Sequence, residues 1–259
     1  MEDILRALKD GRMTLEEASS ELNRRLYSCG HSNIDTGRHA RTGVPEVVLA
    51  SGKTDDQLLD NIGSFVDRSG RALVSRLEPE VFRRIEKRLR KARRSQGIEY
   101  DGDARFMVVR SRGHRVEPTG GKVGLITAGT SDIPVCKEAE IMAREMGCET
   151  MTFFDIGVAG VHRLMDPLQR LKEWGVDVLI VAAGREGALP TLVSGMIDVP
   201  VIGLPISTGY GLHGNGETAL FAMLQSCSPL AVVNIDAGFV AGAVASKVAN
   251  SAALSRKGR

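Results

Sequence analysis

The sequence predicts an α/β protein with a doubly wound parallel sheet, preceded by a smaller α/β domain. Residues 121–250 repeat one pattern: an apolar run, a Gly-rich or polar turn, and an amphipathic segment. The runs are short, apolar on both faces and rich in Val, Ile and Leu, which is typical of parallel strands covered by helices on both sides. The segments between them are long enough for right-handed helical crossovers. The predicted strands are 123–128, 150–154, 178–183, 199–204 and 231–235.

Length and composition allow two domains. A chain of 259 residues with 42% hydrophobic residues can bury a substantial core in one large or two ordinary domains. Residues 111–121 contain Gly113, Pro118, Gly120 and Gly121, which favour a boundary there. We therefore predict an amino-terminal helical and small α/β domain over 1–118 and a catalytic domain over 119–259.

The amino-terminal domain is expected to begin with two short helices in residues 2–26 and to continue as a small α/β module. Thr14 with Glu17, and Thr54 with Gln57, have the spacing of helix capping boxes. The module is predicted to contain strands 47–50, 72–77 and 105–110, a helix from Thr54 to about Arg68, and a helix over 79–94.

The helix over 79–94 is strongly basic, so nucleic-acid binding is one interpretation of it. Its apolar residues, however, form a stripe that includes Ile85 and Leu89, as on a helix docked against a core. We favour the docked helix with a solvated charged face and expect no nucleic-acid partner. A nucleic-acid site would instead bind with a steep salt dependence.

The remaining bulk features predict a cytoplasmic protein with no membrane partner. No apolar run approaches the length of a membrane span, and Met1 precedes acidic residues rather than a basic leader. The four cysteines, Cys29, Cys136, Cys148 and Cys227, show neither the spacing of a zinc site nor that of a disulfide framework.

Two arginines precede the first strand of the small module. Arg38 and Arg41 are three residues apart and can face the same way to bind a phosphate or carboxylate. The alternative is a solvated loop. The following Gly52-Lys53-Thr54 is not a Walker loop, because Val47 occupies the position of the required upstream glycine.

Glycines and residues with hydroxyl or charged side chains follow all five predicted strands of the carboxyl-terminal domain. In a doubly wound sheet, ligands bind outside the carboxyl ends of the strands, so this edge is the predicted active site. The candidates are Thr130, Ser131 and Asp132; Asp155 and Gly157; Gly184, Arg185 and Glu186; Ser207, Thr208, Gly209, His213 and Asn215; and the final turn Asp236-Ala237-Gly238.

Each motif has a functional and a structural interpretation. Hydroxyls and free amides at the start of the helix predicted over 133–146 favour a phosphate, whereas Asp132 either caps that helix, holds a ribose hydroxyl or recruits a cation. Glu186 is a candidate general base, or else a structural ion-pair partner of Arg185. The glycines in 207–216 are typical of backbone folded close around a ligand.

The cysteines differ in their predicted environments. Cys136 and Cys148 are expected to be buried packing residues. Cys227 follows an apolar segment and is predicted near the end of a helix over 217–227, before Pro229. It is a candidate nucleophile, although the carboxyl terminus of a helix raises a thiol pKa, so position alone does not favour this role.

These motifs resemble two related families. Gly129-Thr130-Ser131-Asp132, the run from Gly184 to Pro190 and the run from Val201 to Pro205 are similar to strand-end motifs of aminoimidazole ribonucleotide carboxylases and mutases. That resemblance covers the carboxyl-terminal domain and implies a flavodoxin-like parallel sheet. The amino-terminal pattern from Asp35 to Glu46, together with Gly52-Lys53-Thr54, residues 207–211 and residues 224–227, resembles the LarB family of nickel pincer cofactor biosynthesis proteins.

The LarB resemblance covers both domains and implies a pyridinium-3,5-biscarboxylic acid mononucleotide synthase. Such an enzyme carboxylates the pyridinium ring of nicotinic acid adenine dinucleotide with CO2 and hydrolyses its phosphoanhydride, releasing AMP, as in lactate racemase maturation. By resemblance, Cys227 adds to the ring and Glu186 removes the ring proton. Thr130, Ser131 and Asp132 hold the phosphate and ribose, and residues 209–216 close over the nucleotide.

The resemblance also implies a homo-oligomer, with an octamer expected. The sequence identifies no metal ligand set, and we expect no tightly bound cofactor, although Mg²⁺ often assists phosphoanhydride hydrolysis. The purine-pathway enzymes carry a catalytic histidine immediately before the Leu-Pro pair, where this chain has Ala188. Because this chain lacks that histidine, aminoimidazole ribonucleotide carboxylase or mutase activity is the second hypothesis. A non-catalytic nucleotide-binding protein is the third.

Overall fold

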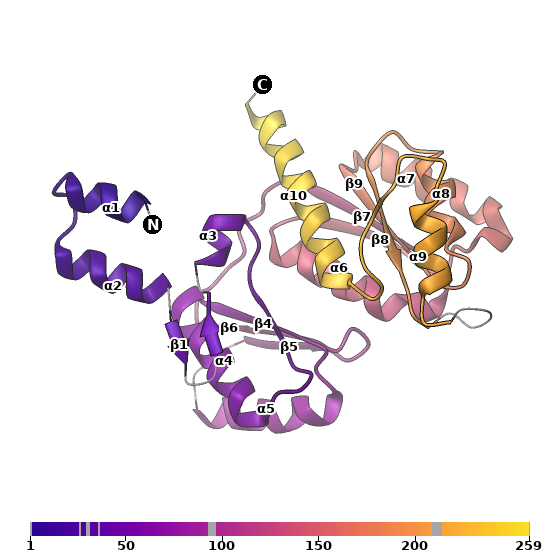
Figure 1. Cartoon of the computed structure of the whole chain (residues 1–259). Helices are drawn as coiled ribbons and strands as arrows, with labels where there is room; N and C mark the ends of the chain where they lie inside the picture. Colours follow the sequence, from indigo (N-terminus) through magenta and orange to yellow (C-terminus); the bar gives the residue numbers. More distant parts are fainter. Residues whose placement is uncertain are drawn as a thin grey trace. The chain divides into compact units, whose positions relative to one another are not determined.

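The computed structural model describes residues 2–25, 27–29, 32–35, 37–92, 97–208 and 214–258. The chain divides into two compact units, Met1–His114 and Arg115–Arg259. The amino-terminal unit runs from indigo to magenta in Figure 1, and the carboxyl-terminal unit continues to yellow.

The amino-terminal unit begins with the two predicted helices, α1 (Glu2–Lys9) and α2 (Leu15–Arg25). The backbone N–H of Glu17 donates to Thr14 Oγ1 at 3.1 Å, and the backbone N–H of Thr14 donates to Glu17 Oε2 at 2.8 Å. Reciprocal bonds of this kind satisfy two donors that the first turn of a helix leaves open. The predicted capping box is confirmed.

The rest of this unit is a small mixed sheet with two helices. Its strands lie in the order β3 (Val47–Leu49), β4 (Arg71–Ser75), β6 (Phe106–Arg110), β5 (Gly97–Asp101). The first pair is parallel and the others are antiparallel. Strand β5, the short pair β1 (Tyr27–Cys29) and β2 (Ser32–Ile34), and helix α3 (Arg38–Thr42) were not predicted.

Both helices predicted to pack on this sheet are present. Helix α4 (Asp55–Ser69) begins with the predicted capping box of Thr54 and Gln57. Helix α5 (Pro79–Ala92) buries Ile85 and Leu89 in the same core. Its basic face is partly paired with acidic side chains, since Arg84 and Arg88 contact Asp55 and Asp56 at 2.7 Å. These contacts support the docked interpretation of α5.

The carboxyl-terminal unit contains the predicted parallel sheet. Its strands are β7 (Lys122–Thr127), β8 (Glu149–Phe153), β9 (Val178–Ala183), β10 (Val201–Pro205) and β11 (Ala231–Val232). They lie in the order β11-β10-β9-β7-β8, and every neighbouring pair is parallel. This is a flavodoxin-like order, in which the direction of winding reverses between β7 and β9. The predicted fold class is confirmed.

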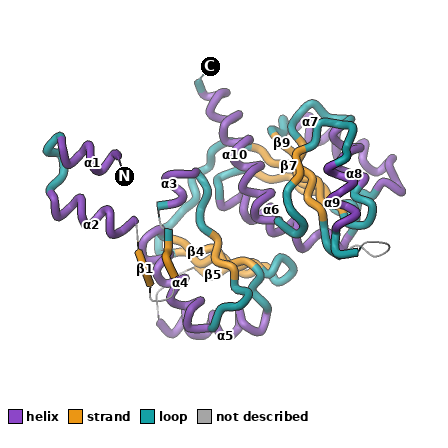
Figure 2. The backbone as a smooth tube through the Cα atoms, viewed as in Figure 1, coloured by secondary structure: helices purple, strands orange, loops and turns teal. Residues whose placement is uncertain are grey.

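Helices cover both faces of this sheet (Figures 1 and 2). Helices α6 (Ile133–Glu145) and α10 (Gly238–Lys257) form one layer, while α7 (Met165–Trp174), α8 (Ala188–Ser194) and α9 (Glu217–Leu224) form the other. Alternate residues of β9 enter opposite cores, as the period of a strand requires. Val178, Ile180 and Ala182 pack toward α6 and α10, and Leu179, Val181 and Ala183 toward the other layer.

Helices α6 and α10 approach each other closely through small residues. A Cβ added to Gly242 would lie 2.4 Å from the carbonyl oxygen of Ala139, which is closer than real Cβ contacts. Ala241, Ala245 and Ala249 of α10 are buried in the same core. Any larger side chain at Gly242 would therefore push the two helices apart.

A strand and a helix of the carboxyl-terminal unit end earlier than predicted. Strand β11 has the two residues Ala231 and Val232 rather than the five of 231–235, although the backbone N–H of Val233 still donates to the carbonyl oxygen of Gly203 at 3.1 Å. Helix α9 ends at Leu224, so Cys227 lies beyond the helix that was predicted to carry it. The backbone N–H of Ser228 donates to Ser226 Oγ at 3.1 Å, and such side-chain bonds favour a turn over a continuing helix.

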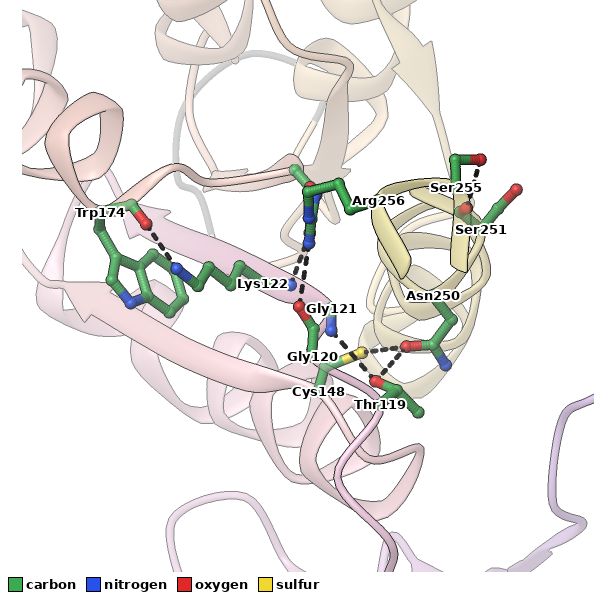
Figure 3. Close-up of polar contacts among 11 residues, drawn as sticks. Thr119, Gly120, Gly121, Lys122, Cys148, Trp174, Asn250, Ser251, Ser255 and Arg256 are labelled. Atoms are coloured by element: carbon green, nitrogen blue, oxygen red, sulfur yellow. Dashed lines mark hydrogen bonds and ion pairs between the residues drawn. The ribbon is translucent and has the colours of Figure 1, made fainter. Parts of the chain in front are cut away.

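Polar side chains at the amino-terminal edge of the sheet pair with one another (Figure 3). The backbone N–H of Lys122 donates to Asp177 Oδ2 at 2.8 Å, and Lys122 Nζ donates to the carbonyl oxygen of Trp174 at 2.8 Å. Arg256 of α10 forms an ion pair with Asp177 and donates to the carbonyl oxygen of Gly120 at 3.0 Å. These contacts fasten α10 to the start of β7.

Two cysteines are buried in the carboxyl-terminal unit. Cys136 and Cys148 are both buried, as predicted, and burial raises the pKa of each thiol. Cys148 Sγ lies 3.2 Å from Asn250 Oδ1, which also accepts from Thr119 Oγ1 at 2.6 Å (Figure 3).

Within the described ranges, no helix has the length and hydropathy needed to cross a membrane.

Candidate active site

A cavity of about 230 Å³ lies at the carboxyl-terminal edge of the parallel sheet. Its walls come from the loops after β7, β8, β9 and β10, so it includes the point between β7 and β9 where the winding reverses. Open α/β sheets bind ligands at this position. Of the predicted site residues, Ser131, Asp132, Gly157, Gly184, Arg185, Glu186 and Thr208 line the cavity.

Asp132 is the buried acid of the cavity. Its residue is 3% exposed, and its Oδ2 accepts the backbone N–H of Gly129 at 2.7 Å. Burial raises the pKa of the Asp132 carboxyl, while backbone N–H groups of Gly129 and Gly184 act in the opposite direction. The carboxyl thus draws together the loops after β7 and β9, and it can hold or accept a proton inside the cavity.

An internal hydrogen bond occupies part of the predicted anion site at the start of α6, and the anion itself stays a prediction. Residues Thr130–Asp132 form a short 3-10 helix, η1, before α6 begins, and the Asp132 side chain does not cap α6. The amide of Gly129 is not free for a phosphate, because the Asp132 carboxylate already accepts it. The Asp132 carboxylate thereby satisfies a backbone N–H that would otherwise lack a hydrogen-bond partner in this turn. Thr130 is exposed and is not among the cavity-lining residues described.

The loop after β10 closes against the loop after β7. Thr208 Oγ1 donates to the carbonyl oxygen of Ser131 at 3.4 Å. The backbone N–H of Ser207 donates to Asp236 Oδ1 at 2.9 Å, so the loop after β11 supports the same segment. Thr208 lines the cavity, whereas Ser207 lies behind it as a supporting residue.

Asp155 supports the loop after β8. Its backbone N–H donates to Thr127 Oγ1 at 3.0 Å, and its carboxylate lies 3.6 Å from Arg163 Nη1. The next wall residue, Gly157, has no room for a side chain, since a Cβ there would lie 2.9 Å from the carbonyl oxygen of Ala128. Gly157 therefore allows this loop to form a close wall of the cavity.

The loop after β9 is a tight turn that carries the two charged side chains. The backbone N–H of Gly187 donates to the carbonyl oxygen of Gly184 at 2.8 Å, and Arg185 has a φ of 39°. A positive φ is unusual for a residue with a Cβ and is often found at functional turns. The turn leaves Arg185 and Glu186 exposed at the cavity, where a bound substrate can reach both.

Positive φ values recur along this edge of the sheet. Asp155, Arg185, Asn215 and Asp236 all have φ between 39° and 60°, and each lies in a loop that follows a strand of the parallel sheet. The composition of these turns identified them as candidate site loops in the sequence, but their positive φ values could not be predicted from it. Sequence reasoning also missed the apolar wall residues Val158 and Ala159, which carry no chemical signal in a single sequence.

Other predicted site residues lie away from the cavity or outside the described ranges. Asn215 is exposed in the turn before α9 and does not line the cavity. Cys227 is exposed in the turn after α9 and does not line it either. Gly209 and His213 lie outside the described residues. Across the described ranges, no group of three or more His, Cys, Asp and Glu side chains could hold a metal ion.

The paired arginines belong to the amino-terminal unit. They lie on helix α3 rather than in a loop, and Arg41 forms an ion pair with Asp35. This hydrogen-bonded pair lowers the pKa of the Asp35 carboxyl. Glu46 is half-buried beside them, which raises the pKa of its carboxyl, and its Oε2 has no hydrogen-bond partner among the described residues. A ligand of Arg41 must therefore compete with Asp35.

Comparisons with known proteins match both units. The AIR carboxylase family model matches residues 122–257, and the model of the LarB/PurE-like N-terminal domain matches residues 26–112. An uncharacterized protein of Methanocaldococcus jannaschii, MJ0165, is 40% identical over 253 residues, which cover 96% of each chain. The same two-domain chain therefore occurs in a relative.

Relatives of the carboxyl-terminal unit alone are also found. The N5-carboxyaminoimidazole ribonucleotide mutase of Thermotoga maritima is 32% identical over 49% of this chain and 74% of its own. A crystal structure of a Treponema denticola PurE2 variant matches with a TM-score of 0.40 and 18% identity, over 55% of this chain and 89% of that one. The family model covers more than half of the chain, so the protein belongs to the AIR carboxylase family and joins its domain to a LarB/PurE-like amino-terminal domain.

Proposed function

We propose that this protein carboxylates the pyridinium ring of nicotinic acid adenine dinucleotide with CO2 and cleaves the phosphoanhydride. The products are pyridinium-3,5-biscarboxylic acid mononucleotide and AMP. Membership of the AIR carboxylase family supports an enzyme. The observation that carries the finer proposal is the LarB/PurE-like domain in the same chain.

The size of the cavity suits a substrate of which only one part is enclosed. Its volume of about 230 Å³ is below the roughly 300–1,000 Å³ of pockets that hold drug-sized ligands. A single ring with part of its ribose fits this size, and the rest of a dinucleotide extends beyond it. Arg185, exposed at the cavity, can attract the substrate's carboxylate or phosphates.

The ring itself explains why a nucleophile is needed. A cationic pyridinium is electron-poor and does not attack CO2. Addition of the Cys227 thiolate forms a carbon–sulfur bond and makes the ring a neutral enamine, whose nucleophilic carbon then bonds CO2. Glu186 takes the proton from that carbon, and expulsion of the thiolate restores the aromatic ring with its new carboxylate. Water cleaves the phosphoanhydride in a separate step.

The proposal extends to the other predicted site residues. Ser131 and Asp132, which line the cavity, are proposed to contact a ribose or ring substituent, and Thr208 and Gly184 to shape the cavity wall. Arg38 and Arg41 are proposed to bind the distal phosphates or carboxylate. Residues 209–216 are proposed to close over the nucleotide, Mg²⁺ to assist hydrolysis, and the chain to act as a homo-oligomer, expected to be an octamer.

One alternative has an observation in its favour. The similarity to the Thermotoga maritima N5-carboxyaminoimidazole ribonucleotide mutase would suit a purine-pathway reaction. Against it, the cavity wall carries Ala188 immediately before Leu189-Pro190, and a methyl group cannot transfer a proton. Glu186 is the acid–base group that this turn supplies instead.

The test is product analysis by mass spectrometry with ¹³C-labelled bicarbonate as the CO2 source. With nicotinic acid adenine dinucleotide, we expect a mononucleotide heavier by one labelled carboxylate, and AMP in equal amount. N5-carboxyaminoimidazole ribonucleotide and aminoimidazole ribonucleotide are the parallel substrates. Turnover of either in place of the pyridinium substrate would establish the alternative and contradict the proposal.

A further inference from the structure

The amino-terminal unit has its own sheet edge at which several strand ends meet. Strands β3 and β4 are parallel, and β5 is parallel to β4 because both are antiparallel to β6 between them. The carboxyl ends of these three strands therefore lie at one edge, where the connections after β3 and β4 lead into α4 and α5. Ligands of open α/β sheets bind at this kind of edge.

Two basic residues come from adjacent strand ends at this edge. Leu49 of β3 lies opposite Ser75 of β4, and the backbone N–H of Ala50 continues the pairing by donating to the carbonyl oxygen of Ser75 at 2.9 Å. Arg76 therefore lies beside Ala50. The backbone N–H of Lys53 donates to the carbonyl oxygen of Ala50 at 3.1 Å, which closes a turn. The Cα atoms of Lys53 and Arg76 are then roughly 12 Å apart at most, a distance that two long side chains can bridge to reach one anion.

The carboxylates closest to these two cations in the sequence are each held by another arginine. Asp55 accepts from Arg84 Nε at 2.7 Å and from Arg84 Nη2 at 2.9 Å. Glu78 forms an ion pair with Arg105 at 2.7 Å. Across the ranges that the structure describes, the two cations themselves have no ion-pair partner. The edge therefore has two positive charges that no carboxylate of the described residues neutralises.

Arg76 is held in an unusual backbone conformation. Its φ is 56°, which is uncommon for a residue with a Cβ and which a glycine would adopt with less strain. The next residue is fixed, because Leu77 is buried and its backbone N–H donates to the carbonyl oxygen of Arg105 at 2.8 Å. Arg76 itself is exposed, so packing in a core does not explain an arginine here. Residues kept at unfavourable φ values are often found at binding sites.

This edge is separate from the arginines of α3. The charges of Arg38 and Arg41 act on Glu46, which directly precedes β3 and so lies at the amino-terminal edge of the small sheet. Glu46 and Ala50 are about 13 Å apart along the strand, at ~3.3 Å per residue. The arginines of α3 and the two cations at the carboxyl-terminal edge therefore cannot bind the same phosphate group.

We propose that Lys53 and Arg76 form a binding site for the phosphate group of a phosphate monoester. Their two positive charges match the charge of about −1.5 to −2 that a monoester carries at pH 7, whereas a carboxylate or a phosphodiester carries only one. The guanidinium of Arg76 can bind two phosphate oxygens at once, and the ammonium of Lys53 acts as a point charge. Gly52-Lys53-Thr54 thus takes part in phosphate binding without being a Walker loop.

Lysine labelling tests this site without turnover. The full chain is acetylated briefly with acetic anhydride in the presence of AMP, inorganic phosphate or adenosine, at an ionic strength kept constant with sodium chloride, and its peptides are quantified by mass spectrometry. AMP should protect Lys53 in a saturable manner, and adenosine should not. Protection by inorganic phosphate as well would show that the phosphate group suffices, and protection by AMP alone would identify a nucleotide as the ligand. Lys87, exposed on α5, is the internal control and should be labelled equally in every sample. Protection of Lys53 by adenosine, by inorganic phosphate alone or by none of the three compounds would overturn the proposal.

The Arg76→Gly variant separates binding from structure. Glycine adopts a positive φ readily, so the urea midpoint of unfolding should stay close to that of the wild type. The AMP concentration that half-protects Lys53 should rise roughly tenfold or more, as expected for the loss of a contact between charged groups. Arg83→Ala removes an exposed arginine of α5 and the same formal charge, so it is the matched control and should leave that concentration unchanged. Unchanged protection in Arg76→Gly, or an equal loss in both variants, would contradict the site.

Discussion

The two edges of the parallel sheet are both rich in polar residues, but they use them differently. At the amino-terminal edge, Lys122, Asp177 and Arg256 satisfy one another and neighbouring carbonyl groups. At the carboxyl-terminal edge, Arg185 and Glu186 are exposed at a cavity on a turn with positive φ. The density of charged residues therefore does not distinguish the two edges, whereas the cavity and the positive φ values of residues with a Cβ do.

The largest expected effect belongs to the carboxyl-terminal edge. Glu186→Gln should lower carboxylation by roughly 10²–10⁴-fold, because an amide cannot remove the ring proton. The thiol adduct can still form, so intact-protein mass spectrometry should find substrate bound at Cys227. Stability to urea should be unchanged, since the side chain is exposed.

The matched control for that variant is Glu149→Gln, which changes an exposed carboxylate at the amino-terminal edge. It should retain wild-type turnover. Equal losses in the two variants would mean that net charge, and not the position of Glu186, governs the reaction.

An intermediate effect is expected at the amino-terminal edge. Arg256→Ala removes the cation beside Asp177, whose side chain is only 5% exposed, and removes a bond to the carbonyl oxygen of Gly120. The urea midpoint of unfolding should fall, because the variant removes an ion pair and a bond to a carbonyl oxygen, although solvent screening at the half-exposed Arg256 limits the loss. Urea denaturation measures this loss.

Lys257→Ala is the control, because it removes a neighbouring exposed cation on the same helix. It should leave the unfolding midpoint unchanged, and turnover per folded chain should be normal in both variants. A specific fall in carboxylation with Arg256→Ala would show that the amino-terminal edge takes part in the reaction.

The smallest expected effect is a pH dependence of stability due to Asp132. Burial raises the pKa of its carboxyl above the usual 3.8, so the folded state binds the proton more tightly than the unfolded state. Its contribution is therefore complete below pH 3.8 and is lost as pH rises through the folded-state pKa. Each unit between the two pKa values corresponds to ~1.4 kcal/mol.

Urea unfolding at a series of pH values tests this dependence. The Asp132→Asn variant cannot titrate at this position, so the difference between its stability and that of the wild type should change over that pH window and nowhere above it. A constant difference across the window would show that the carboxyl has the same proton affinity in both states.

The parts predicted from sequence are those where a local pattern has one solution. Residues 178–183 were identified as a strand because a six-residue apolar run fits a central parallel strand, and β9 has those bounds. The capping boxes at Thr14 and Thr54 were readable because both partners lie within one turn. The position of the candidate site, at the loops that follow the strands, was predicted from the fold class itself.

The parts that were missed depend on contacts between distant residues. Strand β5 is half-polar and pairs only with β6, so its sequence lacks the apolar run of a central strand. The bond from Gly129 to Asp132 competes with an anion for the same amide, which composition cannot show. That Cys227 lies in an exposed turn beyond α9 depends on where the helix ends, at Leu224.

Helix α10 also has a consequence for folding during synthesis. It covers β7, β9 and β10 together with α6, yet it follows all of them in the chain. While a ribosome is still making α10, the apolar face formed by Val123, Ile180 and Leu204 is covered on that side by α6 without α10. Domains generally fold as units in the order in which they emerge. The nascent carboxyl-terminal unit is therefore expected to need protection from aggregation until α10 has left the exit tunnel.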